Sequence, residues 1–206
     1  GASMEELLIV NGCPRGPGSN SEKYSQLFLQ YWGTRAAGYR VTAKKHREIC
    51  ATVGGYQNLL LIFPLYADGL PVTLLYFLKE LEKHAFSHKP TVHVVINCGF
   101  LEPEQNRVAV DMVRLFCREN GYPFGSVLCV GAGEAILETP FIFLVKRKLK
   151  KLAGAIRKRK VTAMMVTMPL SKKLFIKAST QFWLARGEKN QLTRDQMAAL
   201  QIERNK

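Results

Sequence analysis

Four short, continuous apolar runs separated by helical patterns constrain the fold of this chain more than any other feature. They cover residues 7–10, 59–63, 92–96 and 127–130, and none alternates between apolar and polar side chains. Continuous runs of this length are typical of strands that are covered on both faces, as in a parallel sheet. A weaker run at 39–43 follows a glycine and is a candidate for the second strand in chain order.

Between these runs, apolar residues recur at spacings of three and four, which places them on one face of a helix. The sets are Tyr24, Leu27, Phe28 and Tyr31; Leu74, Leu78 and Leu81; Val108, Met112, Leu115 and Phe116; and Leu149, Leu152 and Ile156. Strands that alternate with helices require right-handed crossovers and a sheet covered on both faces. We therefore predict a doubly wound α/β fold with a five-stranded parallel sheet of order 2-1-3-4-5, whose ligands bind beyond the C-terminal strand ends.

Beyond residue 160 this alternation stops. Residues 161–168 suit either a sixth strand or a hydrophobic connector, a helical pattern follows, and Thr193 with Gln196 forms a capping box for a last helix. We predict a main domain over residues 4–160 and a helical C-terminal extension over 161–206, packed on the same domain or on a partner subunit. The apolar residues of this extension exceed what one helix face buries, so we expect a homo-oligomer; they are Phe175, Ile176, Phe182, Trp183 and Leu184.

The composition argues against several classes of protein. No apolar run approaches the roughly 20 residues of a membrane-spanning helix, and no basic segment with an apolar signal core opens the chain, so we expect a cytoplasmic protein. The five cysteines include no C-x-x-C pair and no histidine at ligand spacing, so we expect no bound metal and no structural disulfide. No nucleophile–histidine motif of a hydrolase and no NTPase phosphate loop is present.

The net charge of +14 is concentrated in one segment, because residues 145–160 hold nine Lys or Arg residues and no acid. Three interpretations remain open. The charges can form a solvated helix face, they can contact nucleic acid or an anionic membrane, or they can attract the phosphates of a small molecule or an acidic partner protein.

The segment between the first strand and the first helix is rich in the residues that hold phosphate. It reads NGCPRGPGSNSE over residues 11–22, with Arg15 adding positive charge. Unpaired amides at a helix N-terminus bind anions, and glycines let the backbone approach them closely. The alternative is an ordinary capping box between Ser19 and Glu22.

Two further segments follow strands that adjoin the first one in the predicted order. Residues 59–63 lead into Pro64, Leu65, Tyr66, Ala67 and Asp68, and residues 92–96 lead into Asn97, Cys98, Gly99 and Phe100. Since parallel strands end at the same edge, the three loops are expected to converge. Tyr66 can then stack on a flat ring, and backbone donors around Asn97 to Phe100 can bond a carbonyl edge.

These motifs resemble those of the flavodoxin-like NADPH-dependent FMN reductases and the related iron–sulfur flavoproteins. The phosphate loop of that family usually reads G-S-P-R-x-x-G-N-T, and the matching residues here are Gly12, Pro14, Arg15, Gly18, Asn20 and Ser21. The resemblance covers about residues 6–135, including the proline–aromatic loop after the third strand and the glycine turn after the fourth. The compact cysteine run of the iron–sulfur members is absent, with only Cys50 in that region.

The resemblance implies an FMN site and an NAD(P)H-linked oxidoreductase. It assigns the FMN phosphate to Ser19, Asn20 and Ser21, with Cys13 and Arg15 in the same loop. It places the isoalloxazine ring against Leu65, Tyr66 and Ala67, flanked by Pro64 and Asp68, and the pyrimidine edge against Cys98 and Gly99, flanked by Asn97 and Phe100. Hydride then passes from NAD(P)H to N5 of FMN and on to a small-molecule acceptor that the sequence does not identify. The alternative function is a binding module without flavin that uses the basic segment 145–160 to hold an anionic partner.

Overall fold

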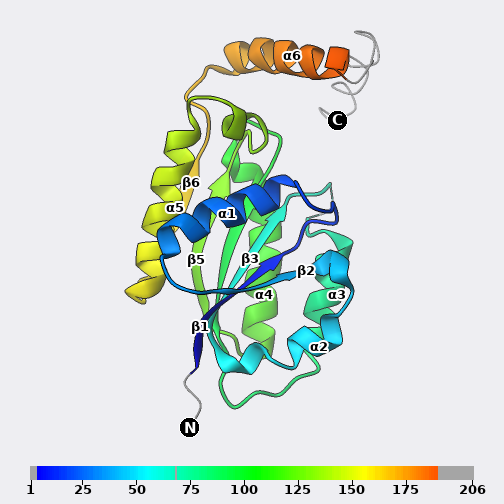
Figure 1. The fold of residues 1–206 in the computed structure, drawn as a ribbon, viewed down its shortest axis with the longest axis vertical. Coiled ribbons are helices and arrows are strands. Elements are labelled where there is room, and N and C mark those ends of the chain that lie inside the picture. Colours follow the sequence, from blue (N-terminus) through cyan, green and yellow to red (C-terminus); the bar gives the residue numbers. More distant parts are fainter. Residues whose placement is uncertain (1–3, 68, 190–206) are drawn as a thin grey trace. The chain divides into compact units, whose positions relative to one another are not determined.

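A computed structural model describes residues 4–67 and 69–189 of the 206-residue chain. Its centre is a parallel sheet in the order β2-β1-β3-β4-β5-β6 (Figure 1). The strands are β1 (Glu5–Asn11), β2 (Ala37–Arg40), β3 (Tyr56–Pro64), β4 (Thr91–Asn97), β5 (Phe124–Val130) and β6 (Ala163–Val166). The predicted order 2-1-3-4-5 is confirmed, and the sheet has one strand more than the five that we expected.

Helices cover both faces of the sheet. They are α1 (Asn20–Trp32), α2 (His46–Cys50), α3 (Val72–Leu81), α4 (Arg107–Asn120) and α5 (Ile142–Arg157), followed by α6 (Lys172–Lys189). The neighbouring helices α1 and α5 lie on one face, and α2, α3 and α4 lie on the other (Figure 1). The sheet is therefore buried on both sides, which explains why its central strands are continuously apolar.

The core consists of the inner strands and the helix faces that the sequence periodicity identified. Residues 59–63 of β3 are completely buried, as are Tyr24 and Phe28 of α1. Phe28 also stacks on Trp32 at a ring-centroid distance of 5.8 Å. On the opposite face, Leu74 of α3 and Val113 of α4 belong to one continuous apolar cluster with the alternate residues of the strands.

The two edges of the sheet differ from the sequence-based expectation. The edge strand β2 covers residues 37–40 instead of 39–43, because Val41 is fully buried and the chain turns there into a short 3-10 helix. At the other edge, Ala163–Val166 pairs with β5 in parallel, so part of the segment left open as a strand or a connector is a strand.

The chain divides into two compact units, residues 1–167 and 168–206. The division falls after β6, since that strand is hydrogen bonded to β5 of the first unit. In the second unit α6 includes the helical pattern expected there, and the capping box at Thr193 lies outside the described residues. Within the part of the chain that the structure describes, no helix is both long enough and apolar enough to cross a bilayer.

Candidate functional site

Three loops meet at the C-terminal edge of the sheet because β1, β3 and β4 are adjacent and parallel. The amide of Gly12 donates to the carbonyl of Ile62 at 2.8 Å, and the amide of Leu65 donates to the carbonyl of Asn97 at 2.8 Å. A Cβ at Gly12 would lie 3.0 Å from both Leu74 Cδ2 and Phe63 Cβ, so a larger residue fits poorly at this turn. The convergence predicted from the sequence is therefore present.

The N-terminus of α1 offers several unused hydrogen-bond donors. Ser19 is its N-cap, and the Ser19 Oγ accepts from the amide of Glu22 at 3.2 Å. The amides of Asn20 and Ser21 find no acceptor among the described residues. Ser21 is buried, with 1% of the residue exposed, and its hydroxyl has no hydrogen-bond partner within the described part of the chain. An anion at this helix terminus would satisfy these groups and gain from the helix dipole.

The capping alternative is realised in the same turn. Besides its own amide bond to Ser19, Glu22 accepts from the amide of Gly18 at 2.6 Å through its carboxylate. Arg40 of β2 forms an ion pair with the same carboxylate. The loop thus already holds one negative charge next to the turn, and that charge is neutralised by a residue from the neighbouring strand. Arg15, which we assigned to the phosphate, is exposed.

The loop after β3 forms a tight turn. Tyr66 and Gly69 exchange two backbone hydrogen bonds of 3.0 and 2.9 Å, and Gly69 has a φ of 110°, which favours glycine. Tyr66 is 40% exposed. Partial burial and the charge of the Cys13 thiolate raise the pKa of Tyr66, while Arg15 opposes the rise; Cys13 and Arg15 both belong to the first loop. Pro64 and Leu65 are half-buried and Ala67 is exposed; Asp68 lies outside the described residues.

The loop after β4 contributes the buried side-chain amide of Asn97 and the exposed ring of Phe100. Asn97 is 5% exposed, and no described residue forms a hydrogen bond with its Nδ2. Gly99 and Phe100 are exposed, and their amides donate to no described residue. The Cys98 amide, in contrast, donates to the carbonyl of Val130 at 3.0 Å, so Cys98 supplies no free backbone donor.

The Cys98 thiol is not poised for nucleophilic chemistry. Cys13 and Cys98 are free and buried. Burial raises the pKa of the Cys98 thiol to about 11, so the thiol is protonated at neutral pH. Among the described residues no group of three metal-ligating side chains lies together.

Two features of this edge were missed in the sequence. The Tyr24 hydroxyl of α1 donates to the carbonyl of Gly133 at 2.5 Å, which ties the first helix to the loop after β5. Thr73, in the first turn of α3, has a buried hydroxyl with no partner. Tyr24 appeared only as part of an apolar helix face, and nothing in the sequence distinguishes it from Phe28. Thr73 carries a weak signal, since it follows Pro71 at the start of a helix.

Comparison with solved structures identifies the architecture. An NADH:FMN oxidoreductase in its apo form superposes with a TM-score of 0.61 and 16% identity, covering 76% of this chain and 90% of that protein. An FMN-dependent NADH-azoreductase from Bacillus anthracis, in complex with FMN, superposes with a TM-score of 0.60 and 10% identity over 74% of this chain and 99% of that protein. A flavodoxin from Streptococcus pneumoniae gives a TM-score of 0.54 and 18% identity over 74% and 99% of the two chains.

The chain has a flavodoxin-like fold. No protein-family model matches the sequence, and no curated protein matches it either. At these identities the flavodoxin-like likeness establishes the arrangement of strands and helices, while the roles of individual side chains depend on the local geometry described above.

Proposed function

We propose that this chain is an FMN-dependent NAD(P)H oxidoreductase that holds the FMN phosphate at the N-terminus of α1. The observation that carries the proposal is the set of unused donors there, namely the amides of Asn20 and Ser21 and the buried hydroxyl of Ser21. A buried polar group without a partner costs free energy, so such a group at a helix N-terminus is explained most simply by a missing acceptor. The FMN and NAD(P)H enzymes among the flavodoxin-like structures support the same function.

The residues at the C-terminal edge fit the other parts of FMN. Tyr66 and Phe100 are exposed aromatic rings on two neighbouring loops, suited to flank the isoalloxazine. The Nδ2 of Asn97 and the amides of Gly99 and Phe100 are available for its carbonyl edge, and Leu65 and Ala67 complete the wall. When bound, FMN supplies a hydride acceptor at N5 and a donor to a second substrate.

The side chains of this site bind and orient without donating protons at neutral pH. The pKa of the Cys98 thiol is raised to about 11, and that of the Tyr66 phenol is also raised, in both cases mainly by burial. Both groups therefore stay neutral around pH 7, which leaves the phosphate loop as the charged part of the site. This distribution suits a reaction whose chemistry resides in the cofactor.

The second candidate is a flavodoxin-like binding module without flavin. It is favoured by Glu22, whose carboxylate already accepts a hydrogen bond from the amide of Gly18 and would repel a phosphate. The module would use α5, on which Val145, Leu149 and Leu152 are buried against the sheet while basic side chains cover the outer face. Among those basic residues, Arg147, Lys150 and Lys151 are exposed.

The absorption spectrum of the purified protein separates the two candidates. The oxidoreductase is expected to bind one FMN per chain, to show a flavin band shifted from that of free FMN, and to lose this band when NADH or NADPH is added without oxygen. A colourless protein that takes up no FMN but is retained on a polyanion column at low salt would instead support the binding module.

A further inference from the structure

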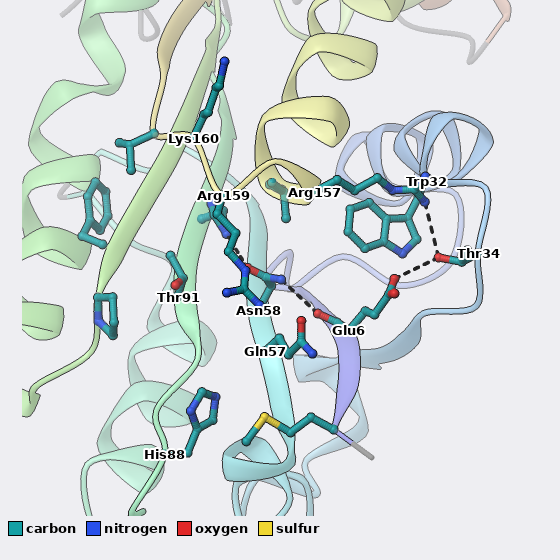
Figure 2. Close-up of a pocket in the computed structure, with 16 residues that line it drawn as sticks. Glu6, Trp32, Thr34, Gln57, Asn58, His88, Thr91, Arg157, Arg159 and Lys160 are labelled. Carbon is teal, nitrogen blue, oxygen red and sulfur yellow. Dashed lines mark hydrogen bonds between the residues drawn. The ribbon is translucent and has the colours of Figure 1, made fainter.

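A cavity opens at the end of the sheet opposite the three loops. It has a volume of about 730 Å³ and is lined by the N-terminal ends of β1, β3, β4 and β5 and by the C-terminal end of α5 (Figure 2). Its lining shares no residue with the three loops at the C-terminal edge. A volume of this size is within the range of small-molecule sites, which span roughly 300–1,000 Å³.

The floor of this cavity is a chain of hydrogen bonds that crosses four strands. The amide of Ser126 donates to His93 Nδ1 at 2.9 Å, which leaves the proton of the neutral ring on Nε2. His93 Nε2 then donates to Asn58 Oδ1 at 3.0 Å, and Asn58 Nδ2 donates to the carbonyl of Glu6 at 3.1 Å. The orientation of Asn58 is thereby fixed, and the floor is a neutral, preorganised polar surface.

Two guanidinium groups lie on different sides of this cavity (Figure 2). Arg157 lies over the ring of Trp32 at 4.6 Å and donates to Thr34 Oγ1 at 3.4 Å. Arg159 extends toward Asn58, whereas the side chain of Lys160 is directed away from it (Figure 2). No described carboxylate lies within 4.0 Å of either guanidinium. The one acid in the lining is Glu6, whose Oε2 accepts from Thr34 at 3.2 Å.

The wall contains a donor that no described residue satisfies. Trp32 is 1% exposed, and its indole Nε1 has no hydrogen-bond partner in residues 4–67 and 69–189. Its ring lies between Arg157 and Glu6 with the nitrogen on the side of Glu6 (Figure 2). A buried N–H without an acceptor is costly, so an acceptor brought by a ligand would stabilise this arrangement.

We propose that this cavity binds a small phosphate monoester, with the phosphoryl group against Arg159 over the polar floor and Arg157 on the other side of the cavity adding positive charge. Guanidinium groups match phosphate oxygens with pairs of parallel hydrogen bonds, and two of them outweigh the single carboxylate of Glu6. The Trp32 indole and the polar floor supply donors and acceptors for the remainder of the molecule. The site is separate from the proposed FMN site, and it stands whether or not the chain binds flavin.

Calorimetric titration with AMP, adenosine and inorganic phosphate tests the proposal. We expect AMP to bind one site per chain, and adenosine to bind at least roughly tenfold more weakly because it lacks the phosphoryl group. Arg159→Ala is expected to weaken AMP binding roughly tenfold, and Glu6→Gln is expected to strengthen it roughly threefold because the competing charge is removed. A gain of affinity in Glu6→Gln cannot arise from misfolding.

Two variants serve as matched controls. Lys150→Ala removes an exposed charge from the same basic segment, 145–160, outside the cavity, and Ser21→Ala alters the other end of the sheet; neither is expected to change AMP binding. The proposal is overturned if AMP and adenosine bind equally, if AMP does not bind at millimolar concentration, or if Lys150→Ala costs as much as Arg159→Ala. Loss of AMP binding in Ser21→Ala alone would place AMP in the proposed FMN site and also overturn it.

Discussion

At the scale of single residues, close packing decides which glycines can be replaced. An added Cβ at Gly125 would come within 2.4 Å of His93 Nδ1 and 2.8 Å of Thr91 Cγ2. At Gly154, inside α5, a Cβ would meet nothing within 4 Å. Gly125 leaves space for the buried, hydrogen-bonded ring of His93, whereas no neighbouring atom requires a glycine at position 154.

We therefore expect Gly125→Ala to destabilise the fold by roughly 2 kcal/mol or more, since His93 must move and lose its bonds. Gly154→Ala is the matched control, and is expected to stabilise the fold by up to about 1 kcal/mol through helix propensity. Urea unfolding followed by circular dichroism measures both changes. Equal effects of the two substitutions would contradict the packing argument.

His93 should also make stability depend on pH. Burial lowers the pKa of His93 from 6.5 to about 4. The unfolded chain therefore binds more protons than the folded one between these values, so stability is fully present above pH 6.5 and falls as the pH drops toward 4. The loss attributable to His93 amounts to roughly 3 kcal/mol. It is checked by urea unfolding at pH 7, 5 and 4, and His93→Gln should lose this part of the pH dependence; an unchanged slope in that variant would refute the assignment.

At the scale of elements, the strands that could be predicted from the sequence are those buried on both faces of the sheet. The inner strands β1, β3, β4 and β5 appear as continuous apolar runs because both of their faces are covered. The edge strands were harder, since β2 alternates between half-buried and exposed residues and β6 between exposed and buried ones. In strands of only four residues this alternation in burial leaves no clear alternation of apolar and polar residues in the sequence. The pairing of β2 with β1 and of β6 with β5 identifies them as strands.

The candidate site could be predicted only in part for a similar reason. The glycines and hydroxyl residues after β1 indicate an anion site at a helix N-terminus, and the parallel order brings the other two loops beside it. The ion pair between Glu22 and Arg40 was not foreseen, because it joins α1 to an edge strand whose position depends on the whole sheet. The unpartnered amide of Asn97 was also not evident, since its environment is set by the loop after β5.

The first turn of α1 provides a test at this scale. We expect Glu22→Gln to increase FMN affinity several-fold, because it removes a negative charge next to the phosphate and retains an acceptor for the Gly18 amide. Glu22→Ala removes both the negative charge and the acceptor for the Gly18 amide, so it should also lower the stability of the helix by about 1 kcal/mol. FMN fluorescence quenching and thermal unfolding measure the two quantities. Weaker FMN binding in Glu22→Gln would show that the carboxylate supports the site instead of opposing it.

At the scale of the whole molecule, the chain has polar chemistry at both ends of one sheet. The C-terminal edge carries unused donors at α1, and the N-terminal edge carries a cavity with two guanidinium groups and a neutral polar floor. The basic segment 145–160 reaches the second of these edges at its C-terminal end, since Arg157, Arg159 and Lys160 line that cavity. Part of the positive charge noticed in the sequence therefore lies in a defined cavity.

Self-association is expected from the second unit. Leu174 and Ile176 of α6 are 56% and 54% exposed, in a segment whose sequence is rich in apolar residues. We expect sedimentation to give a homo-oligomer at micromolar concentration, and Leu174→Glu with Ile176→Glu to shift the protein toward the monomer. A wild-type protein that sediments as a monomer would contradict this expectation.

The central claim is that the N-terminus of α1 binds a phosphoryl group, and a comparison of FMN with riboflavin tests it most directly. Riboflavin has the same ring and lacks the phosphate, so fluorescence titration should show FMN binding roughly 100-fold more tightly, a difference of about 2.7 kcal/mol. Ser21→Ala should weaken FMN binding roughly tenfold and leave riboflavin unaffected, while Ser25→Ala, one turn further along α1, should change neither. Equal affinity for FMN and riboflavin, or binding of neither, would contradict the claim.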